Sequence, residues 1–204
     1  MEGFFVHSNA LVETEHIGDG TRIWAFAHVL GGARIGRGCN VGDHCFIEGN
    51  VRIGDHTIIK NGVSVWSGVT LEDHVFVGPN AVFTNDLYPR AKVYHAEDVE
   101  TQVCTGATIG ANATLRCGIR VGRWAMIGAG SVVARDVPDF ALVYGVPARQ
   151  AGWVCACGER LDLGLTGSGG AACRCGRSYS LVEGRVRADA PIRPPSEDII
   201  TRSE

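Results

Sequence analysis

The side chains of Asn85 and Asp86 follow the end of a long run of regular repeats, and they could do chemistry at that point. Asn85 offers a carbonyl acceptor and an amide donor, which suits the orientation of a reacting amine. Asp86 offers a carboxylate, which could bind the same amine or help to accept its proton. The alternative is an Asx turn that simply begins a loop. We expect this pair to be the catalytic residues of the chain.

Four cysteines in the C-terminal part form two Cys-x-Cys pairs that are separated by fifteen residues. Four thiolates can enclose a tetrahedral Zn²⁺ and leave no open coordination position, so the expected role of such a site is structural. The usual spacing is Cys-x-x-Cys, and a metal-free loop or a redox pair remains an alternative. The predicted ligands are Cys155, Cys157, Cys173 and Cys175.

The repeats before Asn85 are the elements that must position it. Aliphatic residues recur at every sixth position from Leu11 to Phe83 and again from Val103 to Val133. Neither a helical period of about 3.6 nor a strand period of about 2 sustains this spacing. Repeats of six residues are typical of a parallel β-helix, in which each hexad is a short strand with a turn and three hexads complete a triangular coil. The predicted fold class is therefore all-β.

The repeat is interrupted between Phe83 and Val103, which lie twenty positions apart instead of six. About fourteen residues of the segment 84–102 should therefore leave the β-helix. We interpret this segment as a loop over a binding face, with a tolerated surface insertion as the alternative. We expect the β-helix over residues 1–138, a cap over 139–153, a zinc-ribbon-like module over 154–184, and a disordered tail rich in proline and charge over 185–204.

Several motifs resemble those of known acyltransferases. The pattern aliphatic-Gly-x-x-small-x resembles the left-handed β-helix of the hexapeptide-repeat acyltransferase superfamily, and Gly-Val-Pro-Ala-Arg at 145–149 is similar to its cap. Gly-Pro-Asn-Ala-Val-Phe-Thr-Asn at 78–85, followed by Pro-Arg at 89–90, is similar to the family of N-acetyltransferases that act on nucleotide-linked 3-amino sugars. Trp-Ala-Phe-Ala-His at 24–28 agrees, and the resemblance spans roughly residues 5 to 160.

The resemblance implies an acetyl-CoA-dependent N-acetyltransferase for a UDP- or dTDP-linked amino sugar, with the 3-amino group as the expected acceptor, in polysaccharide or glycan biosynthesis. The amine would attack the thioester directly, and the enzyme would be a homotrimer with sites between subunits. The substrate-binding residues that it implies are His28, Ser67, Tyr88 and Arg90. The implied acetyl-CoA residues are Gly110, Ala111, Gly128, Ala129, Gly130, Pro147 and Arg149. Ser67 precedes Asn85 by one coil and stands where relatives often carry an acidic residue.

Composition argues against several other classes of protein. The 204 residues carry 19 Lys and Arg against 22 Asp and Glu, a formal charge of −3, which gives no basic face for nucleic acid. No apolar run approaches the roughly 18 residues that cross a membrane, and the N-terminus lacks the features of a signal peptide. We therefore expect a cytoplasmic protein, in which the eight cysteines fill the core or bind metal rather than form disulfides.

The spacing of the seven histidines bears on other functions that the same fold can have. A zinc hydratase of the carbonic anhydrase kind needs two histidines five residues apart, and no two histidines here have that spacing. An acyltransferase with an O-acetyl or 4-amino sugar acceptor, and a non-catalytic β-helix scaffold, remain alternatives. His44, His56 and His74 each follow an aspartate and are expected at solvated corners, where His56 and His74 should stack. His95 lies in the loop.

Overall fold

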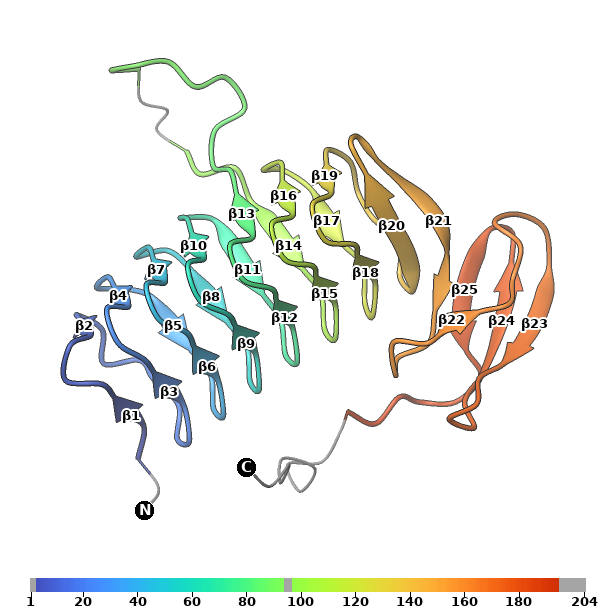
Figure 1. Cartoon of the computed structure of the whole chain (residues 1–204), viewed down its shortest axis with the longest axis horizontal. Coiled ribbons are helices and arrows are strands. Elements are labelled where there is room, and N and C mark those ends of the chain that lie inside the picture. The colour runs from blue at the N-terminus through green and yellow to red at the C-terminus, as the bar shows by residue number, and fades with distance from the viewer. Residues whose placement is uncertain (1–2, 94–96, 195–204) are drawn as a thin grey trace.

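The computed structural model describes residues 3–93 and 97–194, and every regular element in these ranges is a β-strand (Figure 1). The strands from β1 to β19 are two or three residues long and follow one another around three parallel sheets. Within this part of the chain no helix is long and apolar enough to cross a membrane. The predicted all-β fold, a solenoid of stacked parallel coils, is confirmed.

Each coil contributes strands to up to three sheets, and a separate small sheet follows. The ten-stranded sheet is formed, in order, by β1 (Phe5–Val6), β3 (Arg22–Ile23), β6 (Asn40–Val41), β9 (Ile58–Ile59), β12 (Phe76–Val77), β15 (Thr108–Ile109), β18 (Met126–Ile127), β20 (Ala141–Gly145), β21 (Ala148–Val154) and β22 (Arg160–Leu161). The seven-stranded sheet is formed by β19 (Val132–Val133), β16 (Thr114–Leu115), β13 (Val82–Phe83), β10 (Ser64–Val65), β7 (Phe46–Ile47), β4 (His28–Val29) and β2 (Leu11–Val12). The five-stranded sheet is formed by β17 (Arg120–Val121), β14 (Thr101–Val103), β11 (Val69–Leu71), β8 (Arg52–Ile53) and β5 (Arg34–Ile35). The small sheet is formed by β23 (Gly169–Ala172), β24 (Ser178–Val182) and β25 (Arg185–Ala188).

The aliphatic residues of the hexads fill the bore of the β-helix from Ile23 onward, whereas Leu11 is exposed because it pairs with His28, seventeen rather than eighteen residues away. Arg22 pairs with Asn40 and Ile23 pairs with Val41, so equivalent positions are eighteen residues apart, as three hexads per coil predict. In each of these two-residue strands the first residue faces outward and the second faces inward. The inward residues Ile23, Val41 and Ile59 have no exposed surface. Full burial of an aliphatic side chain stabilises the fold by roughly 1.5–3 kcal/mol. This burial, repeated in every coil, lets strands of only two residues persist.

Four of the eight cysteines belong to this core: Cys39, Cys45, Cys104 and Cys117. The Cys39 thiol lies 3.0 Å from the carbonyl oxygen of Gly54, and burial raises its pKa to about 11. A buried thiol of this kind stays protonated and behaves as a small apolar side chain. No cysteine of the chain forms a disulfide. The interpretation of these four residues as core fillers is confirmed.

The corners of the coils hold residues in the left-handed region of backbone conformation. His56 and His74 have φ values of 56° and 57°, and their rings stack with centroids 5.0 Å apart, as predicted. Both are half-buried, whereas His44 is exposed and stacks on Phe26 at 4.9 Å. A Cβ on Gly38, one coil earlier, would lie 2.5 Å from Nδ1 of His56, so the glycine at this corner makes room for the imidazole of His56.

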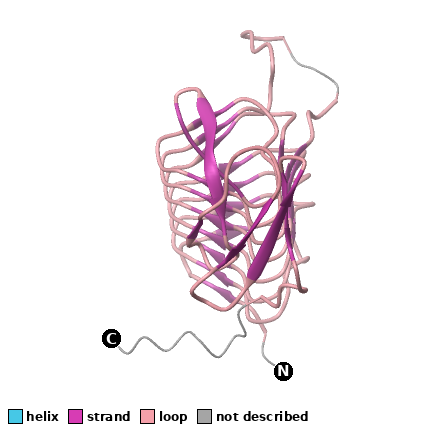
Figure 2. Cartoon of the chain, turned by 90° about the vertical axis from the view of Figure 1, so that its right-hand side faces the viewer, coloured by secondary structure: helices cyan, strands magenta, loops and turns pink. Residues whose placement is uncertain are grey.

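The loop between β13 and β14 projects from the stack of coils in both views (Figures 1 and 2). Across it the register of paired residues rises from eighteen to 32, as in the pairing of Thr70 with Gln102, which accounts for the fourteen residues expected to leave the prism. The segment returns earlier than predicted, because β14 begins at Thr101, whose N–H donates to the carbonyl oxygen of Gly68 at 3.0 Å. Thr101 and Gln102 therefore belong to the sheet, and the loop spans 84–100.

The C-terminal part closes the β-helix and then adds the small sheet. The hairpin of β20 and β21 continues the ten-stranded sheet, and the fully buried Trp153 donates from Nε1 to the carbonyl oxygen of Gly164 at 2.8 Å. Phe140 at the end of the coils packs edge-on against Tyr179 of β24, with ring centroids 5.4 Å apart. This contact joins the small sheet to the β-helix.

The tail does not begin at residue 185 as expected, because β25 pairs with β24 in the antiparallel small sheet. Its alternation places Val186 inward, 4% exposed, between two exposed arginines, and the charges concealed this alternation in the sequence. The rest of the predicted disordered tail includes residues 195–204, which lie outside the described residues.

Candidate active site

The departure of the loop is fixed by Phe83 and Thr84. Phe83 is 1% exposed and fills the bore, and Thr84 continues the ladder by donating its N–H to the carbonyl oxygen of Leu115 at 3.0 Å. The hydroxyl of Thr84 accepts a hydrogen bond from the N–H of Cys117 at 2.9 Å. The next residue, Asn85, is exposed. The chain therefore leaves a rigid coil at a defined point and presents Asn85 at its surface.

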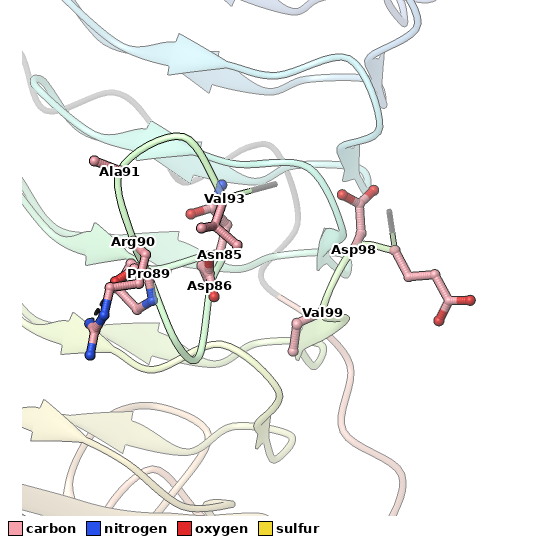
Figure 3. A pocket seen from close by; sticks show the side chains of 9 residues that line it. Asn85, Asp86, Pro89, Arg90, Ala91, Val93, Asp98 and Val99 are labelled. Atoms are coloured by element: carbon pink, nitrogen blue, oxygen red, sulfur yellow. Dashed lines mark hydrogen bonds between the residues drawn. The ribbon is translucent and has the colours of Figure 1, made fainter. Parts of the chain in front are cut away.

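A cavity of about 450 Å³ lies between the two legs of the loop. Figure 3 shows Asn85, Asp86 and Arg90 on the outgoing leg and Asp98 with Val99 on the returning leg. The described residues that line the cavity are Asn85, Asp86, Pro89, Arg90, Ala91, Val93, Glu97, Asp98 and Val99. The structure thus brings three of the predicted site residues, Asn85, Asp86 and Arg90, to one cavity.

Asn85 and Asp86 differ in how their side chains are engaged. No hydrogen bond from the Asn85 side chain to another described residue is found, so its amide is available to a ligand. Asp86 accepts a hydrogen bond from the N–H of Tyr88 at 2.7 Å, which is the Asx turn considered as an alternative. A turn and a binding role are compatible, because a carboxylate has acceptor sites beyond the one that the turn uses.

Two other predicted substrate residues, His28 and Tyr88, do not line the cavity. His28 lies on β4, where its Nε2 is 2.9 Å from Oε1 of Glu13 and its ring meets the edge of Phe46. Tyr88 is 76% exposed and does not line the cavity, and the guanidinium of Arg90 donates to the backbone of Pro89 at 2.9 Å. His95, the other loop histidine named above, lies outside the described residues.

Ser67 is held at the corner between β10 and β11. Its N–H donates to Oε2 of Glu48 at 2.7 Å, and its hydroxyl lies 2.5 Å from Oδ2 of Asp98 on the returning leg. Asn50 donates to the same carboxylate oxygen at 2.9 Å. The hydrogen bonds from Ser67 and then from Asn50 hold the pKa of Asp98 below its ordinary value. Sequence reasoning missed Asp98, because the hexad register does not extend into a loop.

The predicted acetyl-CoA residues include one corner of the later coils. The N–H groups of Gly128 and Gly130 donate to the carbonyl oxygens of Val143 and Ala111 at 2.8 Å, so the fold uses these two amides and they are not available to acetyl-CoA. The N–H of Ala129, between them, and that of Ala111 have no described partner. The amides available on this corner are therefore those of the two alanines, one coil apart.

Pro147 and Arg149 lie in the hairpin of β20 and β21. The peptide bond between Val146 and Pro147 is cis, and both Pro147 and Arg149 are exposed. One guanidinium nitrogen of Arg149 donates to the carbonyl oxygen of Ala148 at 2.9 Å. An exposed arginine at this end of the coils could meet a phosphate group.

The four predicted metal ligands converge. Their Sγ atoms lie within 4.8 Å of one another, with Cys155 and Cys175 3.4 Å apart and Cys157 and Cys173 3.5 Å apart. Zn–S bonds of about 2.3 Å in a tetrahedron place sulfurs about 3.8 Å apart, so the cluster fits Zn²⁺. The two turns are alike, because the glycine after each pair donates back to the carbonyl oxygen of its first cysteine at 2.8 and 2.9 Å.

Groups around the cluster favour the thiolate at Cys175, whereas burial raises the pKa of the Cys157 thiol. The hydroxyl of Tyr179 lies 3.1 Å from Sγ of Cys155, and a guanidinium nitrogen of Arg177 lies 3.3 Å from Sγ of Cys175. Hydrogen bonds from the backbone and then the side chain of Arg177 lower the pKa of Cys175 to about 6. Donors to the sulfurs of a metal site orient its ligands and stabilise their charge.

Comparison with known proteins shows the family. The family model described as bacterial transferase hexapeptide (six repeats) matches residues 16–49 and 50–85, and that of the hexapeptide repeat of succinyl-transferase matches residues 105–135. The dTDP-3-amino-3,6-dideoxy-alpha-D-galactopyranose 3-N-acetyltransferase of Aneurinibacillus thermoaerophilus is 52% identical over 185 residues, which cover 91% of this chain and 95% of the relative. The chain belongs to the nucleotide-linked 3-amino sugar N-acetyltransferases, within the hexapeptide-repeat acyltransferases.

More distant members of the hexapeptide-repeat acyltransferases share the coils. A hexapeptide-repeat-containing acetyltransferase of Vibrio cholerae, solved in complex with acetyl coenzyme A, is 31% identical with a TM-score of 0.50, and the match covers 60% of this chain and 70% of that one. A UDP-N-acetylglucosamine acyltransferase of Bacteroides fragilis is 20% identical with a TM-score of 0.62, covering 74% of this chain and 61% of that one. The latter likeness shows the fold alone.

Proposed function

We propose that the chain transfers the acetyl group of acetyl-CoA to the 3-amino group of a dTDP-linked 3-amino-3,6-dideoxyhexose, for polysaccharide or glycan biosynthesis. The observation that carries the proposal is the 52% identity, over almost the whole of both chains, to a 3-N-acetyltransferase of such a sugar. The cavity at Asn85, at the break in the coils, supports the same conclusion.

In this proposal the amine attacks the thioester carbonyl directly. Asn85 accepts a hydrogen bond from the amine and orients its lone pair, and Asp86 binds the sugar or assists removal of the proton. Holding the two reactants in one geometry supplies much of the rate enhancement. An acetyl-cysteine intermediate is disfavoured, because Cys104 is buried and burial raises the pKa of its thiol to about 11.

Acetyl-CoA is assigned to the corner that carries Ala111 and Ala129. Their N–H groups lie one coil apart, at the spacing of about 4.8 Å that stacked strands have. They have no partner among the described residues, so they suit the amide carbonyls of the pantetheine arm. Gly110 and Gly128 shape this corner through close packing, since a Cβ on them would lie 2.5 Å from the nitrogen of Ala129 and 2.8 Å from Cβ of Tyr144. Gly130 is instead used for its positive φ of 67°, and Pro147 with Arg149 lies in the hairpin that follows. The Vibrio cholerae structure with acetyl coenzyme A supports this class of co-substrate.

A homotrimer with sites between subunits completes the proposal. The outward positions of the seven-stranded sheet include Leu11, Phe46 and Val82, and Leu11 and Val82 are 54% and 48% exposed. The five-stranded sheet instead presents Arg34 and Arg52 at such positions. We assign the seven-stranded sheet to the contact between subunits, because its outward positions are more apolar than those of the five-stranded sheet. His28, which lies on this sheet, then comes close to a neighbouring subunit.

The four-cysteine cluster is proposed as a structural zinc site, in which Cys155, Cys157, Cys173 and Cys175 hold the ion. The bound ion would tie the turn between β21 and β22 to the turn between β23 and β24, and it would supply no chemistry to acetyl transfer. We also propose a cytoplasmic location, where acetyl-CoA is available and thiols stay reduced, in keeping with eight cysteines that form no disulfide.

An acceptor panel tests the proposed function. Release of the free thiol from acetyl-CoA would be followed with dTDP- and UDP-linked sugars that carry a 3-amino, a 4-amino or only hydroxyl groups. We expect the largest kcat/KM for the dTDP-linked 3-amino sugar. Preference for a 4-amino sugar or for O-acetylation would replace this proposal with one of the alternative acceptors, and no turnover with any acceptor would favour a scaffold.

A further inference from the structure

Asp98 joins the returning leg of the loop to the coil that faces Asn85. Its Oδ2 atom lies 2.5 Å from the hydroxyl of Ser67 and accepts a hydrogen bond from Asn50 at 2.9 Å. Asp98 also lines the cavity of Asn85 and Asp86, on the side opposite to them (Figure 3). One carboxylate therefore bonds to the coil and also lines the cavity.

The returning leg reaches this position through close packing on two glycines. A Cβ on Gly68, whose φ is 83°, would lie 3.0 Å from Cβ of Asp98, and a Cβ on Gly118 would lie 3.2 Å from a methyl group of Val99. The N–H of Thr101 then enters the ladder by donating to Gly68. Asp98 is therefore placed by backbone packing as well as by its hydrogen bonds.

The hydrogen bonds around Asp98 leave several acceptor atoms unused. Ser67 donates its hydroxyl proton to Asp98, so its oxygen keeps lone pairs that can accept. Oδ1 of Asp98 has no hydrogen-bond partner among the described residues, and neither does the side chain of Asn85. Asp98 also has no ion-pair partner there. These groups offer acceptors, one of them charged, to a ligand that brings its own donors and positive charge.

We propose that Asp98 is a positioning residue for the acceptor's amino group, which it holds through Ser67 at the cavity of Asn85. This proposal rests on the proposed function, because it assigns the group that recognises the amine of the same substrate. An ammonium group carries three donors and a charge, whereas the hydroxyl of an ordinary sugar carries one donor and none. Asp98 therefore makes the site choose an amino sugar over its hydroxyl counterpart.

The alternative role for Asp98 is purely structural, in which its hydrogen bonds only stabilise the conformation of the loop. The two roles separate in binding measurements with two ligands, a dTDP-linked 3-amino sugar and the same nucleotide sugar with a 3-hydroxyl group. Loss of a residue that only holds the loop should weaken the binding of both ligands alike. Loss of a residue that positions the amine should weaken the binding of the amino sugar only. The measurement needs no turnover, so it stays informative whether or not acetyl transfer takes place.

The variants are chosen to separate charge from shape. Asp98→Asn keeps the size of the side chain and can still bond with Ser67, but it removes the charge. The double variant Ser67→Asp with Asp98→Ser exchanges the two partners and restores one carboxylate at the contact. Glu100→Gln removes an exposed charge from the same leg and is the matched control.

Calorimetric titration at neutral pH should show the wild type and Glu100→Gln binding the amino sugar at least about tenfold more tightly than the hydroxyl analogue. Asp98→Asn should bind the two ligands within about twofold of each other, and the exchanged double variant should recover most of the preference. An Asp98→Asn variant that keeps the preference, or a wild type that has none, would overturn the inference. Acetyl transfer by the wild type without such a preference would leave the proposed function standing and remove this inference alone.

Discussion

At the scale of single residues, the chemistry depends on Asn85, which the coil places and whose side chain bonds to no described residue. Thr84 fixes the departure of the loop through hydrogen bonds to Leu115 and Cys117, and the next side chain enters the cavity. The carboxylates nearby have different tasks, because Asp86 closes a turn and Asp98 binds Ser67. The amide of Asn85 therefore orients the lone pair of the amine, while Asp98 with Ser67 recognises its charge.

Replacing Asn85 by Ala should lower kcat at least about tenfold, because a hydrogen bond that orients the attacking amine contributes on the order of 1.4 kcal/mol or more to the transition state. The side chain bonds to no described residue, so stability should stay within about 0.5 kcal/mol. Steady-state kinetics together with light scattering measure both effects. Wild-type turnover in a variant of unchanged assembly would remove the proposed role of Asn85.

The stacked imidazoles of His56 and His74 should make stability depend on pH. Burial and then repulsion by His56 lower the pKa of His74, while Asp73 and Asp55 oppose the shift. The folded state thus binds a proton less readily than the unfolded state, so the stability contributed by a neutral His74 is present above about pH 6.5 and is lost as pH falls below that value.

The variant His74→Asn keeps a residue that tolerates the positive φ of 57° at this corner and removes the titrating ring. Thermal unfolding at pH 7 and pH 5 should show a smaller loss of melting temperature on acidification in the variant than in the wild type. Equal losses in both proteins would show that the pair does not set the acid sensitivity.

At the scale of elements, the coils could be predicted from the sequence, whereas the contacts of the loop and the strand β25 could not. Hexads of inward aliphatics fixed the parallel strands, the register of eighteen and the point after Phe83 where the period is lost. Contacts such as that between Asp98 and Ser67 follow the path of a loop, which no period encodes. β25 was also missed, because the single inward residue Val186 lies between charged neighbours.

The small C-terminal sheet should depend on its metal. Its buried side chains are few, including Tyr179 and Leu181, so the four thiolates would supply a large part of its stability when they hold Zn²⁺. Purified protein should contain about one zinc per chain by mass spectrometry, in keeping with a site of four thiolates. Chelation should lower the melting temperature, and turnover of protein that remains folded should be unchanged. Absence of zinc, or loss of turnover ahead of unfolding, would contradict a structural site.

At the scale of the whole molecule, the β-helix is a straight scaffold whose three faces differ. The loop projects beyond the coils (Figure 2), and the seven-stranded sheet presents apolar side chains such as Phe46 and Val82 at outward positions. A prism with few concave features gains enclosed sites by association, so the cavity of one subunit and the alanine corner of another are expected to meet. This arrangement would bring the amine and the thioester together.

The substitution Val82→Arg tests this arrangement. Val82 faces outward on β13 and is 48% exposed, so an arginine there should leave the fold of a coil intact and place an unpaired charge in the proposed contact. Thr70→Arg, on the five-stranded sheet, is the matched control. Light scattering should show a smaller species and activity should fall only for Val82→Arg. A trimer with full activity would place the contact on another face.

The most direct test of the account is to identify the product of one reaction. Protein, acetyl-CoA and dTDP-linked 3-amino-3,6-dideoxygalactose would be incubated together, and the purified product would be examined by NMR and mass spectrometry. The account predicts free coenzyme A and an acetyl amide on the nitrogen at C3 of the sugar. An acetyl ester on a hydroxyl group, or an unchanged nucleotide sugar, would contradict it.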